Sequence, residues 1–180
     1  MTLREGPLRQ TEASDPTVQR LADLFADHPV WQDAMTRIRP GATSVVYFNH
    51  RPQDTWRLVK TKPGVRLEPG AAARPDFVFC FTPAAVDELA AVSGAIDDVA
   101  VALFDLMLSD DPQRRVDFGI VAPFWTLVRH GHLRLVLEAG PKVLAYGAGH
   151  GILTLGQLRK FVGALRTGSP EDIRPVADSC

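Results

Sequence analysis

Apolar residues follow two different spacings along the chain, and the changes between them divide it into helical and strand segments. In the N-terminal part they recur every three or four residues, as expected for helices with one buried face. Asp15 and Pro16 indicate the start of the first helix, because an N-cap acceptor followed by proline is a typical helix beginning. The pattern predicts two short helices ending at Pro40-Gly41, with apolar positions at Val18, Leu21, Phe25, Trp31, Met35 and Ile38.

The next runs are rich in β-branched and aromatic residues, which is typical of strands. "TSVVYFNH" and "TWRLVK" are separated by "RPQD" and predict a hairpin, and a short third strand is expected at "GVRLE". The run "DFVFCF" is apolar on both of its faces. It therefore predicts a central strand that is covered on both sides.

A second helical region follows these strands. Thr82 and Pro83 repeat the pattern of a cap followed by proline, and that helix closes at Ser93-Gly94. A further helix is expected over Ala95–Ser109. Because a surface helix usually has a single apolar stripe, this one is expected to be buried along most of its length. Its apolar residues are Ile96, Val99, Leu103, Leu106 and Met107 on one face and Val101, Phe104 and Leu108 on much of the other.

The last third of the chain returns to strand spacing at "RRVDFGIV". Phe124–His130 fits either a strand or a short helical turn. "HLRLVLE" alternates between apolar and polar residues, so we predict a strand that pairs with "KVLAY" after a turn at Gly140-Pro141. "GAGHG" is typical of a loop, and Thr154 with Gln157 predicts a capping box for a final helix.

This order of elements predicts an α+β domain with a largely antiparallel sheet. Residues 1–14 are polar and unpatterned and are predicted to be a flexible arm. Residues 15–168 form a single domain in this interpretation, and residues 169–180 a polar C-terminal tail. A chain of 180 residues, 46% of them hydrophobic, can build a core without a metal or a disulfide.

Composition and charge exclude several classes of partner. Twenty basic and twenty-one acidic residues give a net charge of −1, so no basic excess can neutralise phosphates and we expect no nucleic acid partner. Two cysteines make no disulfide framework, and "MTLREGPLRQTEASD" lacks the apolar region of a secretory signal. The apolar stretch "VAVALFDLML" is too short to cross a bilayer. We therefore expect a cytoplasmic protein without a transmembrane segment.

The histidines of "HGH" are the most conspicuous polar motif. Residues two apart on a strand share a face, so both imidazoles could reach one metal ion. A catalytic zinc site needs a third protein ligand, however, and a structural site needs four. We therefore predict that His130, His132 and His150 do not jointly bind a metal and that "HGH" belongs to a solvent-facing turn.

No arrangement of residues indicates catalysis. The serines lack a Gly-x-Ser-x-Gly motif, and "GAGHG" lacks the Gly-Lys-Ser/Thr ending of a phosphate loop. Cys80 lies in an apolar run, which raises the pKa of a thiol. The pairs Asp97-Asp98 and Asp110-Asp111 lie at helix ends, where capping and solvation explain them. We predict no catalytic residue, no cofactor and no enzyme activity.

Three stretches of the chain resemble the sterol carrier protein type 2 superfamily. They are "WRLVK", "PDFVFCFTPAAVDELA" and "VDFGIVAPFWTLVRHGHLRLVLEAGPKVL", the last being similar to its divergent prokaryotic branch. The resemblance runs roughly from Val45 to Leu165, and the N-terminal helical segment is additional to it. It implies a mostly antiparallel five-stranded sheet with helices on one face. It also implies a tunnel between them for fatty acyl chains, sterols or acyl-CoA, bound without a catalytic residue.

An apolar ligand would account for a helix with two apolar faces, because a sheet covers only one of them. We expect this ligand between the sheet and the helix over Ala95–Ser109, with contacts at Leu103, Met107, Phe118, Phe124 and Trp125. The alternative is a cavity filled by side chains. The domain would then be a protein-interaction or regulatory module, which could form a homo-oligomer. A contiguous apolar cavity of about 300 Å³ or more favours the ligand carrier.

Overall fold

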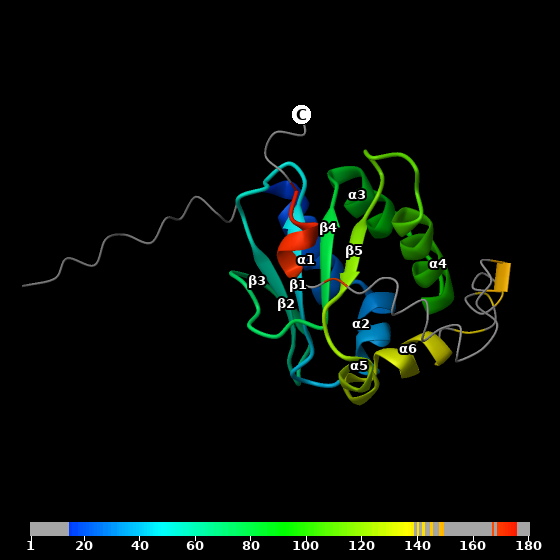
Figure 1. Ribbon diagram of the computed structural model, residues 1–180. Helices are drawn as coiled ribbons and strands as arrows, with labels where there is room; N and C mark the ends of the chain where they lie inside the picture. Colours follow the sequence, from blue (N-terminus) through cyan, green and yellow to red (C-terminus); the bar gives the residue numbers. More distant parts are fainter. Residues whose placement is uncertain are drawn as a thin grey trace, which may run out of the picture.

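A five-stranded sheet lies at the centre of the computed structural model, which describes residues 15–138, 140, 142, 145, 148–149, 167 and 169–175 (Figure 1). The strand order is β3-β2-β1-β4-β5, and only the β1–β4 pair is parallel. The predicted α+β fold with a largely antiparallel five-stranded sheet is therefore confirmed. The strands are β1 (Thr43–Phe48), β2 (Trp56–Lys60), β3 (Val65–Pro69), β4 (Phe77–Phe81) and β5 (Asp117–Ile120).

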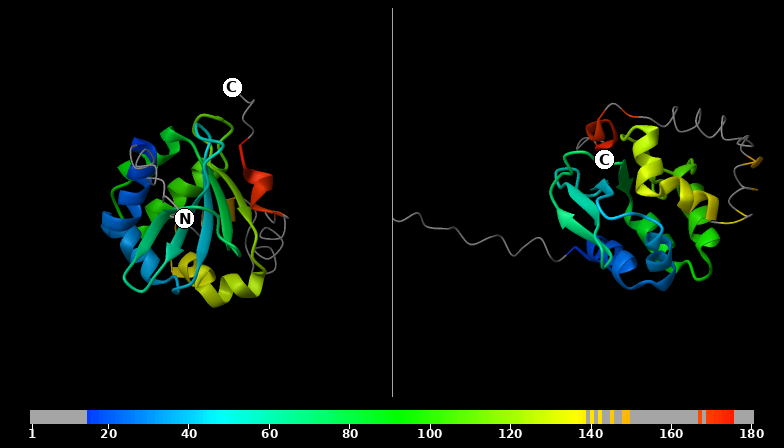
Figure 2. Two further views of the ribbon diagram at one scale, coloured as in Figure 1. Left: turned by 90° about the vertical axis from the view of Figure 1, so that its left-hand side faces the viewer. Right: turned by 90° about the horizontal axis from the view of Figure 1, so that it is seen from below.

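Four α-helices cover one face of the sheet, as Figure 2 shows from the side. They are α1 (Pro16–Asp27), α2 (Pro29–Thr36), α3 (Pro83–Ala91) and α4 (Ile96–Met107). Asp15 caps α1 by accepting from the backbone N–H groups of Thr17 and Val18, and Thr82 caps α3 by accepting from Ala85 N–H. The cap-and-proline signals in the sequence therefore give the correct starts. The two N-terminal helices are part of the core, because Leu21 of α1 packs in one cluster with Phe48 and Phe81 of the sheet.

The opposite face of the sheet is covered by a short 3-10 helix, η1 (Pro170–Ile173). Ile173 packs against Val45, Tyr47, Val78 and Cys80. The Tyr47 hydroxyl donates a hydrogen bond to Glu171 Oε1 at 3.2 Å, and the Arg174 guanidinium lies over the Tyr47 ring. The sequence predicts only a polar tail at this position, but the tail contributes to a core. The covering of β4 on both faces is confirmed.

Helix α4 is less buried than its apolar composition predicts. Val99 and Leu106 are buried, whereas Val101 and Phe104 are half-buried. Val101 and Phe104 are not fully exposed, so the predicted burial of the helix is confirmed only in part. In the described part of the chain, no helix is both long and apolar enough to cross a membrane.

Helices α5 (Phe124–His130) and α6 (His132–Glu138) follow β5 and lie at one end of the sheet. Phe124–His130 is thus helical. The prediction of a strand at "HLRLVLE" is wrong. A seven-residue run with apolar residues at 133, 135, 136 and 137 satisfies helical spacing as well as alternation, and Leu, Arg and Glu are strong helix formers. Arg134 also pairs with Glu138 one turn later, at 2.5 Å, which supports the helix.

The predicted partner strand "KVLAY" is described only at Lys142 and Ala145, and both are helical, which contradicts the hairpin. In "GAGHG", Ala148 and Gly149 are described and are helical as well, so the loop prediction fails there. The helix predicted after Thr154 lies outside the described residues.

Cys80 is a free and buried thiol on β4. Burial, and then the negative charge of Asp117, raise the pKa of this thiol to about 12. We expect the folded protein, as a Cys180→Ser variant, to leave Cys80 unlabelled by an aromatic disulfide reagent at about pH 8, where about one thiol in ten thousand is ionised. The same variant should label fully in denaturant. Rapid labelling of the folded variant would contradict the prediction.

Candidate functional site

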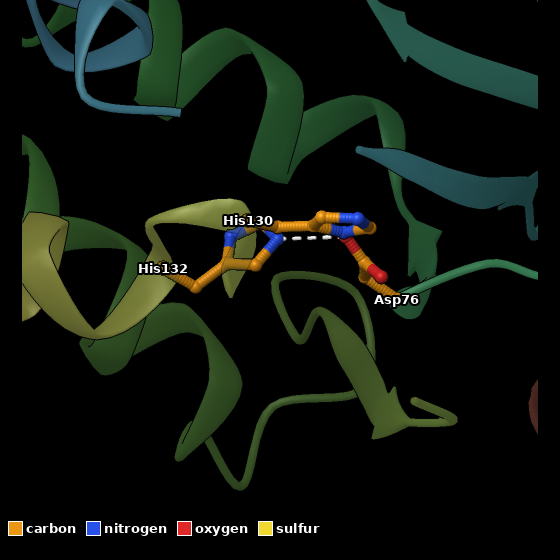
Figure 3. A group of neighbouring side chains, drawn as sticks. All are labelled: Asp76, His130 and His132. Carbon is orange, nitrogen blue, oxygen red and sulfur yellow. Dashed lines mark hydrogen bonds and ion pairs between the residues drawn. The ribbon is translucent and has the colours of Figure 1, made fainter. Parts of the chain in front are cut away.

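Asp76, His130 and His132 converge on one point at the end of the sheet (Figure 3). Asp76 Oδ2 lies 2.7 Å from His130 Nδ1 and 2.8 Å from His132 Nε2. The Asp76 side chain is 1% exposed, whereas the imidazoles are 19% and 16% exposed. The cluster therefore combines a buried carboxylate with two imidazoles that solvent can reach.

The main chain of Asp76 holds its side chain in place. Asp76 precedes β4, and its N–H donates to the carbonyl oxygen of Thr43 at 2.7 Å. Its own carbonyl oxygen accepts from Val121 N–H and Ala122 N–H at 3.0 and 3.1 Å. Asp76 is thus fixed between the start of β1 and the segment that follows β5.

A tight turn at Gly131 places the two histidines. Gly131 has a φ of 92°, ends α5 and donates its N–H to the carbonyl oxygen of Val128. A Cβ at this position would lie 2.2 Å from the carbonyl oxygen of Arg37, so only glycine fits. The turn at "HGH" is therefore as predicted, but it does not face solvent: both imidazoles point inward to Asp76.

Asp76, His130 and His132 together offer three potential ligands for a metal ion. The histidines of "HGH" lack a third ligand in the local sequence, and Asp76 supplies one. One potential ligand atom from each of Asp76, His130 and His132 lies within 4.8 Å of the other two. His150 lies outside the described residues, so the prediction about the three histidines together stays a prediction. Asp76 is 54 residues from His130, and nothing in the local sequence relates the two.

The hydrogen bonds define which imidazole nitrogens carry protons when no metal is bound. An ionised carboxylate only accepts hydrogen bonds, so the nitrogens that face it must be N–H donors. His130 is then protonated at Nδ1 and His132 at Nε2.

A second feature is an open depression between α4 and β5, with a volume of about 370 Å³. Arg115 and Asp117 form an ion pair of 2.8 Å in its lining, and Leu108 is 48% exposed. The lining therefore combines apolar side chains with one ion pair, and the depression is open, unlike the enclosed tunnel that the sequence resemblance implies. Its lining residues are Phe104, Met107, Leu108, Arg115, Val116, Asp117 and Phe118.

The structure brings together two of the five residues predicted to contact a ligand. Met107 and Phe118 both line the depression. Leu103 packs against the core on the helix side of the sheet. Phe124 and Trp125 contact each other edge to face in α5, outside this lining, and Trp125 is 75% exposed. Contact of any of the five with a ligand stays a prediction, but a ligand confined to the depression would touch Met107 and Phe118 and not Trp125.

Aromatic rings connect the depression with the histidine cluster. Phe118 lies in the lining of the depression, and its ring centroid is 5.5 Å from that of Phe77. The Phe77 ring in turn meets the His132 ring edge to face at 4.6 Å. Both candidate sites therefore lie along one row of side chains on the helix side of β4 and β5.

Comparison with known proteins gives one relevant match. No family model and no curated protein matches the chain. A solved structure described as "UbiJ-SCP2 Ubiquinone synthesis protein" matches with a TM-score of 0.40 and 15% sequence identity, over 67% of this chain and 85% of that chain. Its description contains the family that the sequence resembles. A likeness with this TM-score and identity carries no argument about this chain, so function has to come from the residues of the chain itself.

Proposed function

We propose that the chain binds an apolar ligand, of the fatty acyl or sterol-like class, non-covalently in the depression between α4 and β5. The observation that supports the proposal is the depression itself, whose volume of about 370 Å³ falls within the range of small-molecule sites. Met107, Leu108 and Phe118 supply its apolar wall. Binding of this kind needs no chemical step, and the proposal includes none.

Apolar contact has to supply most of the affinity. Arg115 is already paired with Asp117, so a charged group on the ligand would have to compete with an existing ion pair. Each methylene that leaves water contributes about 0.8 kcal/mol, so about six of them contribute about 5 kcal/mol before the costs of association. The Arg115–Asp117 pair suits the polar end of the ligand, which stays near solvent.

A pair of aspartate substitutions tests the site. Leu108 and Trp125 are both exposed apolar residues, but only Leu108 lines the depression. We expect Leu108→Asp to weaken binding of a fluorescent fatty acid by at least about tenfold, because the ligand must then cover a carboxylate. Trp125→Asp should leave the affinity within about twofold of wild type, since it adds the same charge elsewhere.

Two outcomes would contradict the proposal. One is the absence of measurable binding by the wild-type protein, and the other is an equal loss in both variants. Either would favour the alternative of a protein-interaction module. In that case Trp125 is the first surface residue to test, by the effect of Trp125→Asp on the oligomeric state.

We keep the expectation of a cytoplasmic location, which the free thiol of Cys80 supports. The expectations of no nucleic acid partner, no enzyme activity and a possible homo-oligomer stay predictions.

A further inference from the structure

We propose that Asp76, His130 and His132 bind one divalent transition-metal ion, a function independent of the apolar ligand. Two imidazole nitrogens and one carboxylate oxygen form a ligand set that suits zinc and ferrous iron. Three protein ligands leave at least one coordination position for water or another small molecule. The partial exposure of both imidazoles gives the ion a way in and gives that position access to solvent.

The present distances are those of hydrogen bonds, and a metal requires only a small change in them. Around a tetrahedral zinc ion with bonds of about 2.0–2.1 Å, ligand atoms lie about 3.3 Å apart. Asp76 Oδ2 is now 2.7 and 2.8 Å from the two nitrogens. Each nitrogen has to move away from the oxygen by roughly half an ångström. The two nitrogens lie within 4.8 Å of each other, so rotation of the side chains also has to bring this distance to that of a metal site.

The buried carboxylate also favours a cation at this position. Within the described residues, the ion-pair partners of Asp76 are His130 and His132, and no Lys or Arg reaches it. A carboxylate in such a buried place is costly without a cationic partner. A divalent ion supplies a positive charge at this place. When it binds to the nitrogen of each ring that faces Asp76, the ring carries its proton on the other nitrogen.

The cluster is held by rigid elements. Asp76 is tied through its main chain to Thr43, Val121 and Ala122. The carbonyl oxygen of His130 accepts from Arg39 N–H at 2.9 Å. The ring of His132 contacts the ring of Phe77 edge to face. Ligands on preorganised elements lose little freedom when they bind a metal, so no refolding is needed to form the site.

Zinc retention is the direct test, with His50→Gln as a matched control. His50 Nε2 lies 3.0 Å from Asp15 Oδ2, so it forms a histidine–aspartate pair that lacks a second imidazole. All proteins carry Cys180→Ser, which removes the terminal thiol as a competing ligand. After loading with Zn²⁺ and desalting, we expect about one zinc ion per chain in the reference protein and in His50→Gln. Asp76→Asn and His132→Gln should bind zinc at least about 100-fold more weakly and lose it on desalting.

Asp76→Asn keeps the experiment decisive if His132→Gln destabilises the protein. Its amide oxygen still accepts a hydrogen bond from one imidazole, so the fold should persist while the anionic ligand is lost. The melting temperature should rise with added Zn²⁺ in the reference protein and in His50→Gln, but not in Asp76→Asn.

Zinc absent from the reference protein after loading, or retained equally by Asp76→Asn, would overturn the proposal and leave the cluster as a hydrogen-bonded tie. Leu108→Asp should keep its zinc, so failure of the metal site and failure of the apolar-ligand site are separable.

Discussion

Replacement of Gly131 by alanine is expected to lower the free energy of unfolding by about 3 kcal/mol or more. Two costs add at this position. The backbone has a φ of 92°, where a residue with a Cβ loses about 1–2 kcal/mol. The added Cβ would also lie 2.2 Å from the carbonyl oxygen of Arg37, and because that atom is backbone, the turn or the segment after α2 has to move. Urea unfolding measures the loss.

Gly41→Ala separates the two costs. Gly41 has a similar φ of 97°, but no atom lies within 4 Å of a Cβ built there. This control should lose only about 1–2 kcal/mol, the cost of the left-handed backbone alone. Equal losses in the two variants would mean that the turn between α5 and α6 adjusts freely and does not fix His130 and His132 in place.

Local signals in the sequence predict the parts of the fold that depend on near neighbours. Asp15 with Pro16, and Thr82 with Pro83, give the starts of α1 and α3 because capping acts within one helical turn. The run at Phe77–Phe81 is read correctly as a covered strand, since apolar residues on both faces leave no side for water.

Local apolar spacing gives the wrong element at His132–Glu138. Seven residues contain too few helical turns to distinguish the period of a strand from the period of a helix. Leu133, Leu135 and Leu137 alternate as in a strand, while Leu133 and Val136 also have the spacing of one helical face. The Arg134–Glu138 pair at i,i+4 is a helix signal that the alternation conceals. Charge spacing should therefore be weighed together with apolar spacing in short runs.

Local sequence patterns also do not predict that the three candidate metal ligands meet, and the reason is different. Asp76 meets His130 and His132 only because β4 lies beside β5 and the chain returns through α5. That arrangement is a property of the tertiary fold. A strand at "HLRLVLE" would also put His132 on a solvent face, whereas in α6 its ring faces Asp76.

The two N-terminal helices, additional to the family that the sequence resembles, are expected to be essential for stability. Leu21 of α1 is 0% exposed and packs in the main core cluster, and α1 contacts both α3 and β3. We expect Leu21→Ala to lower the free energy of unfolding by about 3 kcal/mol, through lost apolar burial and the cavity that remains. Thermal or urea unfolding of the whole chain gives the value.

Gln19→Ala on the exposed face of α1 is the matched control, because it also shortens a side chain of this helix to alanine. Its hydrogen bond to Asp23 is exposed, so the change should stay within about 0.5 kcal/mol. A loss below about 1 kcal/mol for Leu21→Ala would mean that α1 unfolds separately from the sheet. The expected loss would show that α1 unfolds in the same cooperative unit as the sheet. If α1 unfolded separately, a cavity beneath it would not change the free energy of unfolding of the sheet.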